Sequence, residues 1–268
     1  MEKMLLPKEL EKVRKEIEAT LKPTIKITTK EEQTTLYQSK FSGLPYLPKT
    51  EEHPKDAAGN PMKLLAQINF EELPSNLEDL PKKGILQFFL AAEDDVMGLN
   101  FDDQTEQTNF KVVYHKELLP EGQLVTDFSY QNHSEEEYFP VTNELSLTFN
   151  LEHEAVSVAD HAFENAFGNL DFEEIVKTED NEDITLWEIY AETLTNDGHK
   201  IGGYAFFTQA DPREDETYDD YDILLLQIDS EDEAGIMWGD SGVGNFFIKK
   251  EDLKNGDFSN ILYNWDCC

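Results

Sequence analysis

The chain of 268 residues carries 57 acidic and 22 basic side chains, which give a formal net charge of −35 at pH 7. This charge argues against binding to nucleic acid or to an anionic membrane surface, because both require Lys and Arg side chains. Hydrophobic residues make up 39% of the chain and aromatic residues 11%, so we expect a globular protein with a sizeable core.

The first thirty residues differ in charge from the rest of the chain, with eight Lys or Arg and five Glu. Five apolar side chains in this segment recur at helical spacing: Leu6, Leu10, Val13, Ile17 and Leu21. The spacing predicts an amphipathic helix over about residues 7–21, with Pro7 in its first turn and Pro23 beyond its end. We expect this basic helix to dock on the acidic remainder of the chain.

A first group of strands follows. Thr24–Thr29 alternates between apolar and polar residues and predicts a strand. A loop rich in Gly and Pro at Phe41–Pro48 leads into three further predicted strands: Met62–Phe70, Gly84–Ala91 and Phe110–His115. Pro74–Leu80 predicts a short helical turn between the first two of these, and Leu145–Leu151 alternates again and predicts another strand.

The middle of the chain, about residues 155–197, predicts helices. Apolar residues from Ala155 to Phe167 fit one helix that ends at Gly168. A second helix fits the apolar spacing from Ile184 to Leu194, although the alternation at its start also fits a strand.

The last part of the chain begins with the pair Gly202 and Gly203 and predicts three more strands: Ile223–Asp229, Val243–Ile248 and Phe258–Trp265. Residues Asp211–Asp222 contain seven acids and one Arg, a composition typical of an exposed loop.

The chain contains an internal repeat. Three pairs of segments align at offsets of 160, 160 and 158 residues: Phe41–Leu47 with Ile201–Phe207, Leu64–Asn69 with Leu224–Asp229, and Gly84–Leu90 with Gly242–Ile248. Three matches in the same order predict two β motifs, about 41–115 and 201–265, packed around a pseudo-two-fold axis. We expect an α+β fold of mainly antiparallel strands flanked by helices, in one domain over residues 1–268.

The motifs within these segments resemble those of the YwqG-like family of bacterial proteins, which has no assigned function. They are Gly43–Pro48, Leu64–Ile68, Gly84–Phe89, Ile201–Tyr204, Leu224–Asp229 and Trp238–Gly242. The resemblance covers nearly the whole chain and implies an α+β fold with a duplicated β motif in a soluble bacterial protein. It supplies no catalytic residues. Ala205 departs from the pattern, where Pro is expected.

Location follows from what the sequence lacks. No apolar run approaches the length that spans a bilayer, and Lys and Glu interrupt the N-terminal residues where a secretory signal would be apolar. The two cysteines of the chain, Cys267 and Cys268, are adjacent, and adjacent cysteines rarely bridge each other. The pattern predicts a reduced, cytoplasmic protein.

Three partial motifs carry little weight. Gly239–Gly242 matches part of a serine-protease nucleophile motif, but the equivalent turn of the first repeat is Lys82-Lys83-Gly84, so a simple turn is favoured. His153-Glu154 begins a zinc-protease pattern that lacks its second His. The acidic loops lack the central Gly of calcium-binding loops. We therefore expect no cofactor and no dedicated metal site.

Two polar residues stand inside apolar strands at matching positions of the repeat, Gln67 and Gln227. A buried amide must find hydrogen-bond partners, because leaving it unpaired costs about 1–3 kcal/mol. The favoured interpretation is a structural hydrogen bond to the backbone of each Gly loop. The alternative places both amides in a shared cleft at the pseudo-two-fold axis.

Two functions remain open from the sequence. The first is a non-enzymatic cytoplasmic binding protein whose acidic surface recognises a basic protein or peptide. The second is a hydrolase or metal-dependent enzyme that uses Asp211, Asp229, Asp240 and His199. The candidate binding residues are Gln67, Gln227, His199, Asp211, Asp229, Trp238 and Asp240. An enzyme would group such side chains in a pocket, whereas a binding protein would spread them over an exposed face.

Overall fold

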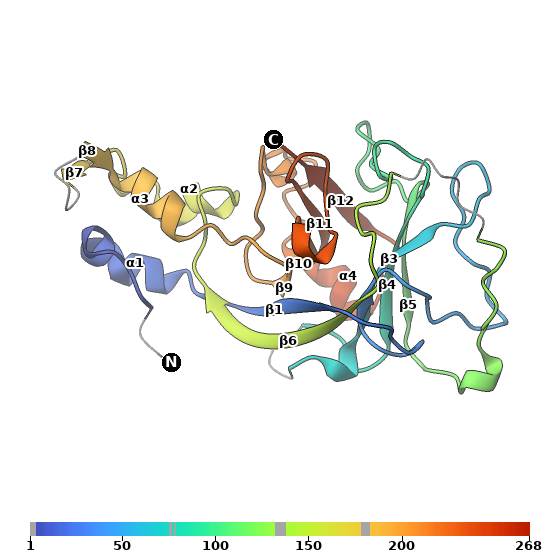
Figure 1. Ribbon diagram of the computed structural model, residues 1–268. Coiled ribbons are helices and arrows are strands. Elements are labelled where there is room, and N and C mark those ends of the chain that lie inside the picture. Colours follow the sequence, from blue (N-terminus) through green and yellow to red (C-terminus); the bar gives the residue numbers. More distant parts are fainter. Residues whose placement is uncertain (1–3, 75–76, 78, 132–137, 178–182) are drawn as a thin grey trace.

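A ten-stranded antiparallel sheet is the central feature of the computed structural model, which describes residues 4–74, 77, 79–131, 138–177 and 183–268 (Figure 1). Its strands in chain order are β1 (Lys22–Glu31), β2 (Lys40–Phe41), β3 (Lys63–Asn69), β4 (Ile85–Leu90), β5 (Phe110–His115), β6 (Leu145–Glu154), β9 (Lys200–Gly202), β10 (Ile223–Asp229), β11 (Val243–Ile248) and β12 (Ile261–Asp266). They lie side by side in the order β12-β11-β10-β9-β1-β6-β2-β3-β4-β5. The prediction of mainly antiparallel β structure is confirmed.

The helical elements are short. They are the 3-10 helices η1 (Lys8–Val13), η2 (Phe70–Glu72), η3 (Glu121–Gln123), η4 (Pro212–Glu214) and η5 (Asp232–Ala234), and the α-helices α1 (Arg14–Ala19), α2 (Ala162–Phe167), α3 (Leu186–Thr193) and α4 (Lys250–Asn255). A separate two-stranded hairpin consists of β7 (Ile175–Lys177) and β8 (Asp183–Thr185).

The centre of the large sheet is the long pair β1 and β6, which runs in register from Lys22 opposite Glu154 to Glu31 opposite Leu145. On one side of this pair β9 bonds to β1, and on the other side β2 bonds to β6. The strands β10 to β12 continue beyond β9, and β3 to β5 continue beyond β2. In Figure 1 the central pair is long and curved, so that the two outer groups of strands lie near each other.

The main core lies between these two outer groups. Phe88 of β4 packs on Phe246 of β11 with ring centroids 4.8 Å apart, and Phe110 of β5 packs on Tyr263 of β12 at 5.1 Å. All four rings have no exposed surface. Because each buried aromatic side chain contributes about 1.5–3 kcal/mol, the contact between the outer groups is a large part of the stability.

A second, smaller core lies at one end of the molecule, beside the helices α1, α2 and α3 (Figure 1). Leu10 and Ile17 are fully buried there among aromatic rings that include Phe163 and Tyr190. Helix α3 begins at a capping box, in which the Thr185 hydroxyl and the Glu188 backbone and carboxylate bond reciprocally. The N-terminal helical segment therefore packs mainly on this helical core and not on the sheet.

Several sequence-based boundaries need correction. The N-terminal helix is present, but its first half is the 3-10 helix η1 and only Arg14–Ala19 is α-helical. The helix predicted from Ala155 was wrong in extent, because α2 begins only at Ala162. His153, of the partial zinc-protease motif, lies in strand β6 and not on a helix.

Other elements were not predicted from the sequence, and one predicted turn lies partly outside the described residues. The strands β2 and β9 and the helix α4 were not predicted, since each is only two to six residues long. Three residues of the helical turn predicted at Pro74–Leu80, residues 75, 76 and 78, lie outside the described residues. Within the described ranges, no helix combines the length and the apolar character needed to cross a membrane.

Candidate functional site at the Gly loops

Two loops follow the short strands β2 and β9, and we call residues 42–46 the first Gly loop and residues 202–206 the second Gly loop. Gly43 has φ +79°, and Gly202 and Gly203 have φ +73° and +72°. A Cβ atom at Gly203 would lie 2.0 Å from the Glu154 Oε1 atom. Glycine is therefore required at Gly203 both by backbone conformation and by the close approach of a carboxylate.

A buried amide from β3 fixes the first Gly loop. The Gln67 Oε1 atom accepts a hydrogen bond from the Tyr46 backbone N–H at 2.8 Å, and its Nε2 atom donates to the carbonyls of Leu36 and Gln38 at 2.9 Å. From β4, the Gln87 Nε2 atom donates to the Tyr46 carbonyl at 2.8 Å. Both polar groups of the Tyr46 backbone are thus held by side-chain amides.

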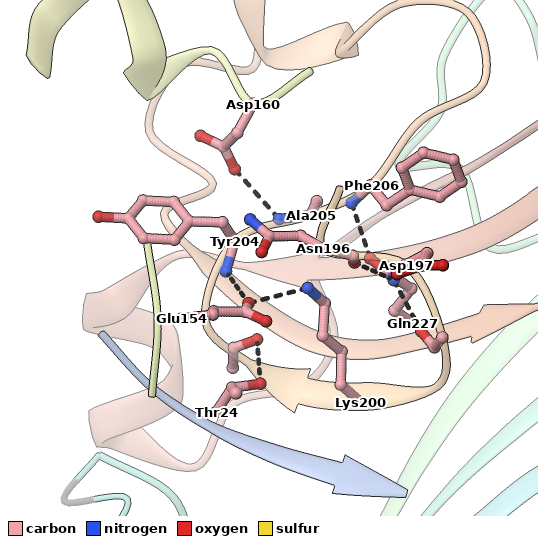
Figure 2. Close-up of polar contacts among 12 residues, drawn as sticks. Thr24, Glu154, Asp160, Asn196, Asp197, Lys200, Tyr204, Ala205, Phe206 and Gln227 are labelled. Atoms are coloured by element: carbon pink, nitrogen blue, oxygen red, sulfur yellow. Dashed lines mark hydrogen bonds and ion pairs between the residues drawn. The ribbon is translucent and has the colours of Figure 1, made fainter. Parts of the chain in front are cut away.

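The second Gly loop is fixed in the same way (Figure 2). The Gln227 Oε1 atom accepts from the Phe206 N–H at 2.8 Å, and Nε2 donates to the carbonyls of Asn196 and Gly198 at 3.0 and 2.8 Å. The Asn245 Nδ2 atom donates to the Phe206 carbonyl at 2.8 Å. The hydrogen bonds of Gln67 and Gln227 are those of the structural interpretation, and the two amides, on strands β3 and β10, bond separate loops.

A lysine beside each amide is also fully buried. The Lys200 Nζ atom donates to Glu154 Oε1 at 2.8 Å, and the same oxygen accepts from the Tyr204 N–H at 2.8 Å (Figure 2). In the first Gly loop, Lys40 Nζ donates instead to the carbonyls of Thr35 and Leu44 at 2.7 and 2.9 Å. Burial lowers the pKa of Lys200 and the pKa of Lys40 to about 8 each.

A buried ion cluster supports the second Gly loop from the side of α2. The Arg213 guanidinium bonds Asp160 at 2.9 Å and Asp211 at 2.7 Å, and Asp160 also accepts from the Ala205 N–H at 3.1 Å. Burial opposes ionisation of Asp160, but the charge of Arg213 outweighs it and holds the pKa of Asp160 below its ordinary value. Asp160 therefore bonds the loop directly, and Asp211 helps to hold Arg213 beside Asp160.

The same cluster has the spacing of a metal site, because ligand atoms of Asp160, His161 and Asp211 lie within 4.8 Å of one another. A cation already lies among them, however, since Arg213 bonds both carboxylates and is 4% exposed. A divalent metal would have to displace this guanidinium, so the donor set fits an internal ion pair better than a metal centre.

His199 and Asp229 form a separate group near the end of β10. The Asp229 N–H donates to His199 Nδ1 at 3.0 Å, so the ring proton is on Nε2 and is donated to Glu231 at 3.0 Å. Burial lowers the pKa of His199 and raises the pKa of Asp229. With both ring nitrogens engaged, His199 has no free lone pair for a general base.

Trp238 and Asp240 lie on a turn between η5 and β11 and differ in exposure. The Trp238 indole has no exposed surface and covers Gly244, where a Cβ would lie 2.4 Å from its ring. Asp240 is exposed. Among the predicted residues, the structure therefore brings together His199 and Asp229, places Asp211 in the Arg213 cluster, and places Gln67 on β3 beside the first Gly loop.

Four buried charged residues near these loops were missed in the sequence: Lys40, Glu154, Lys200 and Arg213. The repeat held part of the information, because Lys40 and Lys200 align at the offset of 160 residues and each precedes an apolar residue and a Gly-containing turn. Glu154 and Arg213 stand at unmatched positions, and only the fold brings them to the second Gly loop.

A pocket borders each Gly loop. The pocket at the second loop has a volume of about 490 Å³ and is lined by Gly202, Gly203, Lys22, Leu224 and Leu253 among others. The pocket at the first loop has a volume of about 600 Å³, with Thr34, Leu44 and Glu144 in its lining. The predicted polar residues Gln67 and Gln227 line neither pocket.

Fold and loops together define an antiparallel β protein whose glycine loops are held by buried amides and lysines. Residues 39–267 match the family described as Domain of unknown function (DUF1963), and the chain belongs to this family. The N-terminal helical segment and β1 lie before the matched region. No curated protein matches the chain.

Proposed function

We propose that this protein is a non-enzymatic binding protein whose acidic surface recognises a basic protein or peptide. The distribution of charge supports this. Among the residues that the structure describes, seven with a formal charge are buried, three basic and four acidic: Lys40, Lys200, Arg213, Glu154, Asp160, Asp211 and Asp266. Their sum is −1, so −34 of the formal charge of −35 is carried by the remaining residues. Such a surface attracts cations over a distance of about 10 Å at 0.1 M salt.

The observation that carries the proposal is the segment after Asp211, which we call the acidic loop, residues 212–222. Its start is fixed, because Asp211 and Arg213 are buried in the ion cluster. Beyond that point Glu214, Asp215 and Glu216 are exposed in succession. Further along, Asp219 and Asp222 are also exposed, and Asp220 pairs with Lys249. A concentrated negative surface on a fixed base suits recognition of a basic partner.

The enzymatic alternative has less support. Its four residues do not converge in a pocket, because Asp211 is bonded to Arg213, Asp240 is exposed on a turn, and His199 donates and accepts within the protein. The pKa shifts of His199 and Asp229 arise from burial beside structural partners, which also occurs away from catalytic sites.

We further propose that the chain is one domain over residues 1–268, built from two copies of one β motif related by a pseudo-two-fold axis. Both copies carry the amide bond to a Gly-loop N–H, a buried Lys, and a register shift at the same place, Leu64/Ala66 in β3 and Leu224/Leu226 in β10. The motif resemblance supports a YwqG-like bacterial protein, and the two free cysteines support a cytoplasmic location.

The test is binding of an octalysine peptide, measured by calorimetry at several salt concentrations. The loop variant carries Glu214→Gln, Asp215→Asn, Glu216→Gln and Asp219→Asn. A control removes four exposed carboxylates elsewhere: Glu31→Gln, Glu52→Gln, Asp102→Asn and Glu152→Gln. The two variants have equal net charge, so general attraction is the same in both.

We expect the loop variant to lose about tenfold more affinity than the control, with a shallower dependence on salt. Equal losses in the two variants would mean that octalysine senses only net charge, and the acidic loop would not be the binding surface. If the loop is supported, proteins retained from a lysate at low salt and released at high salt identify the natural partner.

A further inference from the structure

Three sulfur-containing residues lie at the turn that precedes β11. Met237 begins this turn, and Cys267 and Cys268 follow directly after the neighbouring strand β12. The backbone N–H of Ser241 donates to the Met237 Sδ atom at 3.4 Å, so the thioether is folded back over the turn. The Cys268 N–H donates to the Asp240 carbonyl at 3.3 Å, which holds the cysteine pair against the same turn.

Two glycines allow this close approach. Gly239 has φ +54°, and a Cβ there would lie 2.6 Å from the Cys267 Sγ atom. At Gly242 a Cβ would lie 2.7 Å from the Cys267 Cβ atom. The turn therefore keeps free the space that the Cys267 side chain uses. Any side chain at Gly239 would push the thiol away from the turn.

All three residues have surface that is exposed to solvent. Cys268 is exposed, Cys267 is half-buried, and Met237 is 37% exposed. Both cysteines are free thiols. Two thiols and a thioether make a soft ligand set, which selects soft cations such as Cu(I) over Mg²⁺ or Ca²⁺.

We propose that Met237, Cys267 and Cys268 form a binding site for one soft monovalent cation of the Cu(I) class. The two cysteines bind as thiolates and Met237 binds through its neutral thioether. Binding displaces one proton from each thiol, so two protons are released per cation and the bound group has a net charge of −1. Since protons compete with the metal, affinity rises with pH. This site is independent of the acidic loop.

The site also has an internal reporter. A Cβ at Gly239 would lie 3.1 Å from the Trp265 ring as well as 2.6 Å from Cys267 Sγ, so this indole lies beside the thiol. Trp238, on the same turn, packs against Trp265 with centroids 6.2 Å apart. A heavy soft ion on Cys267 will quench the fluorescence of this pair. Trp187 lies on α3, and Trp187→Phe removes its background emission.

The experiment uses the reduced, full-length chain under anaerobic conditions, with Cu(I) supplied from a chromophoric chelator and Ag(I) as a redox-inert probe. Ligands are removed singly by Cys267→Ser, Cys268→Ser and Met237→Leu, and Met4→Leu serves as the thioether control. We expect one ion per chain, with affinity reduced about 100-fold by loss of a thiolate and about tenfold by loss of the thioether. The Met4→Leu variant should bind like the wild type.

Three results would overturn the proposal. Unchanged affinity in Met237→Leu would show that the thioether is not a ligand. One ion per two chains would show that the exposed thiols bridge molecules. Binding without quenching of Trp238 and Trp265 would place the ion away from the turn. Circular dichroism of each variant separates loss of a ligand from loss of the fold.

Discussion

Replacing Gln227 by Leu tests whether the buried amides hold the Gly loops. The substitution keeps the size of the side chain and removes three hydrogen bonds, to the Phe206 N–H and to the carbonyls of Asn196 and Gly198. The bond to Asn196 is buried and leaves a carbonyl without a partner, at a cost of about 1–3 kcal/mol. The other two bonds are partly accessible to water and contribute about 0.5–1.5 kcal/mol each.

These terms sum to about 2–6 kcal/mol, and the added methyl surface of Leu offsets about 1 kcal/mol. We therefore expect Gln227→Leu to lose about 3 kcal/mol from the free energy of unfolding, measured by urea denaturation. Hydrogen exchange should show the Phe206 amide, protected in the wild type, exchanging faster. Gln123 is exposed, and Gln123→Leu provides the matched control.

The first Gly loop gives an internal comparison. Gln67 Oε1 also accepts from the Gln87 amide at 2.7 Å, so Gln67→Leu leaves one more buried donor without a partner. The loss should exceed that of Gln227→Leu. If Gln227→Leu unfolds within about 0.5 kcal/mol of the control and the Phe206 amide stays protected, the loop is held by other contacts and the reasoning fails.

Three further predictions concern other parts of the molecule. Ile17→Ala should lower the free energy of unfolding, measured by urea denaturation, by about 2–5 kcal/mol because Ile17 is fully buried. Leu5→Ala should change it little, because Leu5 is 94% exposed. Equal effects of the two substitutions would contradict a helical core. The pKa of His199 lies below its ordinary value of 6.5, so the unfolded chain takes up a proton first and stability should fall as pH drops below about 6.5. In His199→Gln the stability should fall less over the same pH range. A pH profile identical to that of the wild type would refute the assignment of this loss to His199. The melting temperature should rise with sodium chloride, since salt screens repulsion within a chain of net charge −35; no response would mean that the acids are already neutralised locally.

The strands could be predicted from the sequence because their signal is local. Leu64–Asn69 and Ile223–Asp229 are apolar runs bounded by turn residues, and they are strands β3 and β10 at nearly these bounds. The short strand β9 carries little pattern of its own. It forms because β1 offers hydrogen-bonding partners to Lys200, Ile201 and Gly202. Such an element depends on tertiary pairing that spacing does not encode.

The helix predicted from Ala155 failed for a related reason. Ala155 and Val156 have the apolar character of a helix face, but both are buried in the small helical core directly after β6. The chain stays extended there because β6 continues to Glu154, whose carboxylate must reach Lys200. Burial of a charged pair thus overrides the local helical spacing. The polar residues of the predicted site do not lie together, because they form hydrogen bonds with separate structural partners.

In our proposal, the differences between the two β motifs indicate where a basic partner binds. Both motifs bury a Lys beside the Gly loop, yet Lys40 bonds backbone carbonyls while Lys200 bonds the carboxylate of Glu154. A feature present in both motifs, such as the buried Lys, serves a structural role in this proposal, because each motif must fix its own Gly loop. The Arg213 cluster and the acidic loop belong to the second copy alone in our proposal. The Arg213 cluster therefore gives the second Gly loop an additional fixed support. The acidic loop is attached to this cluster, so it is better ordered before binding than a free loop. Ordering before binding reduces the entropy lost when a partner associates.

Arg213→Met, which leaves Asp160 and Asp211 buried without their cation, should consequently weaken octalysine binding although it makes the protein more acidic. Stronger binding by this variant would show that charge alone determines recognition.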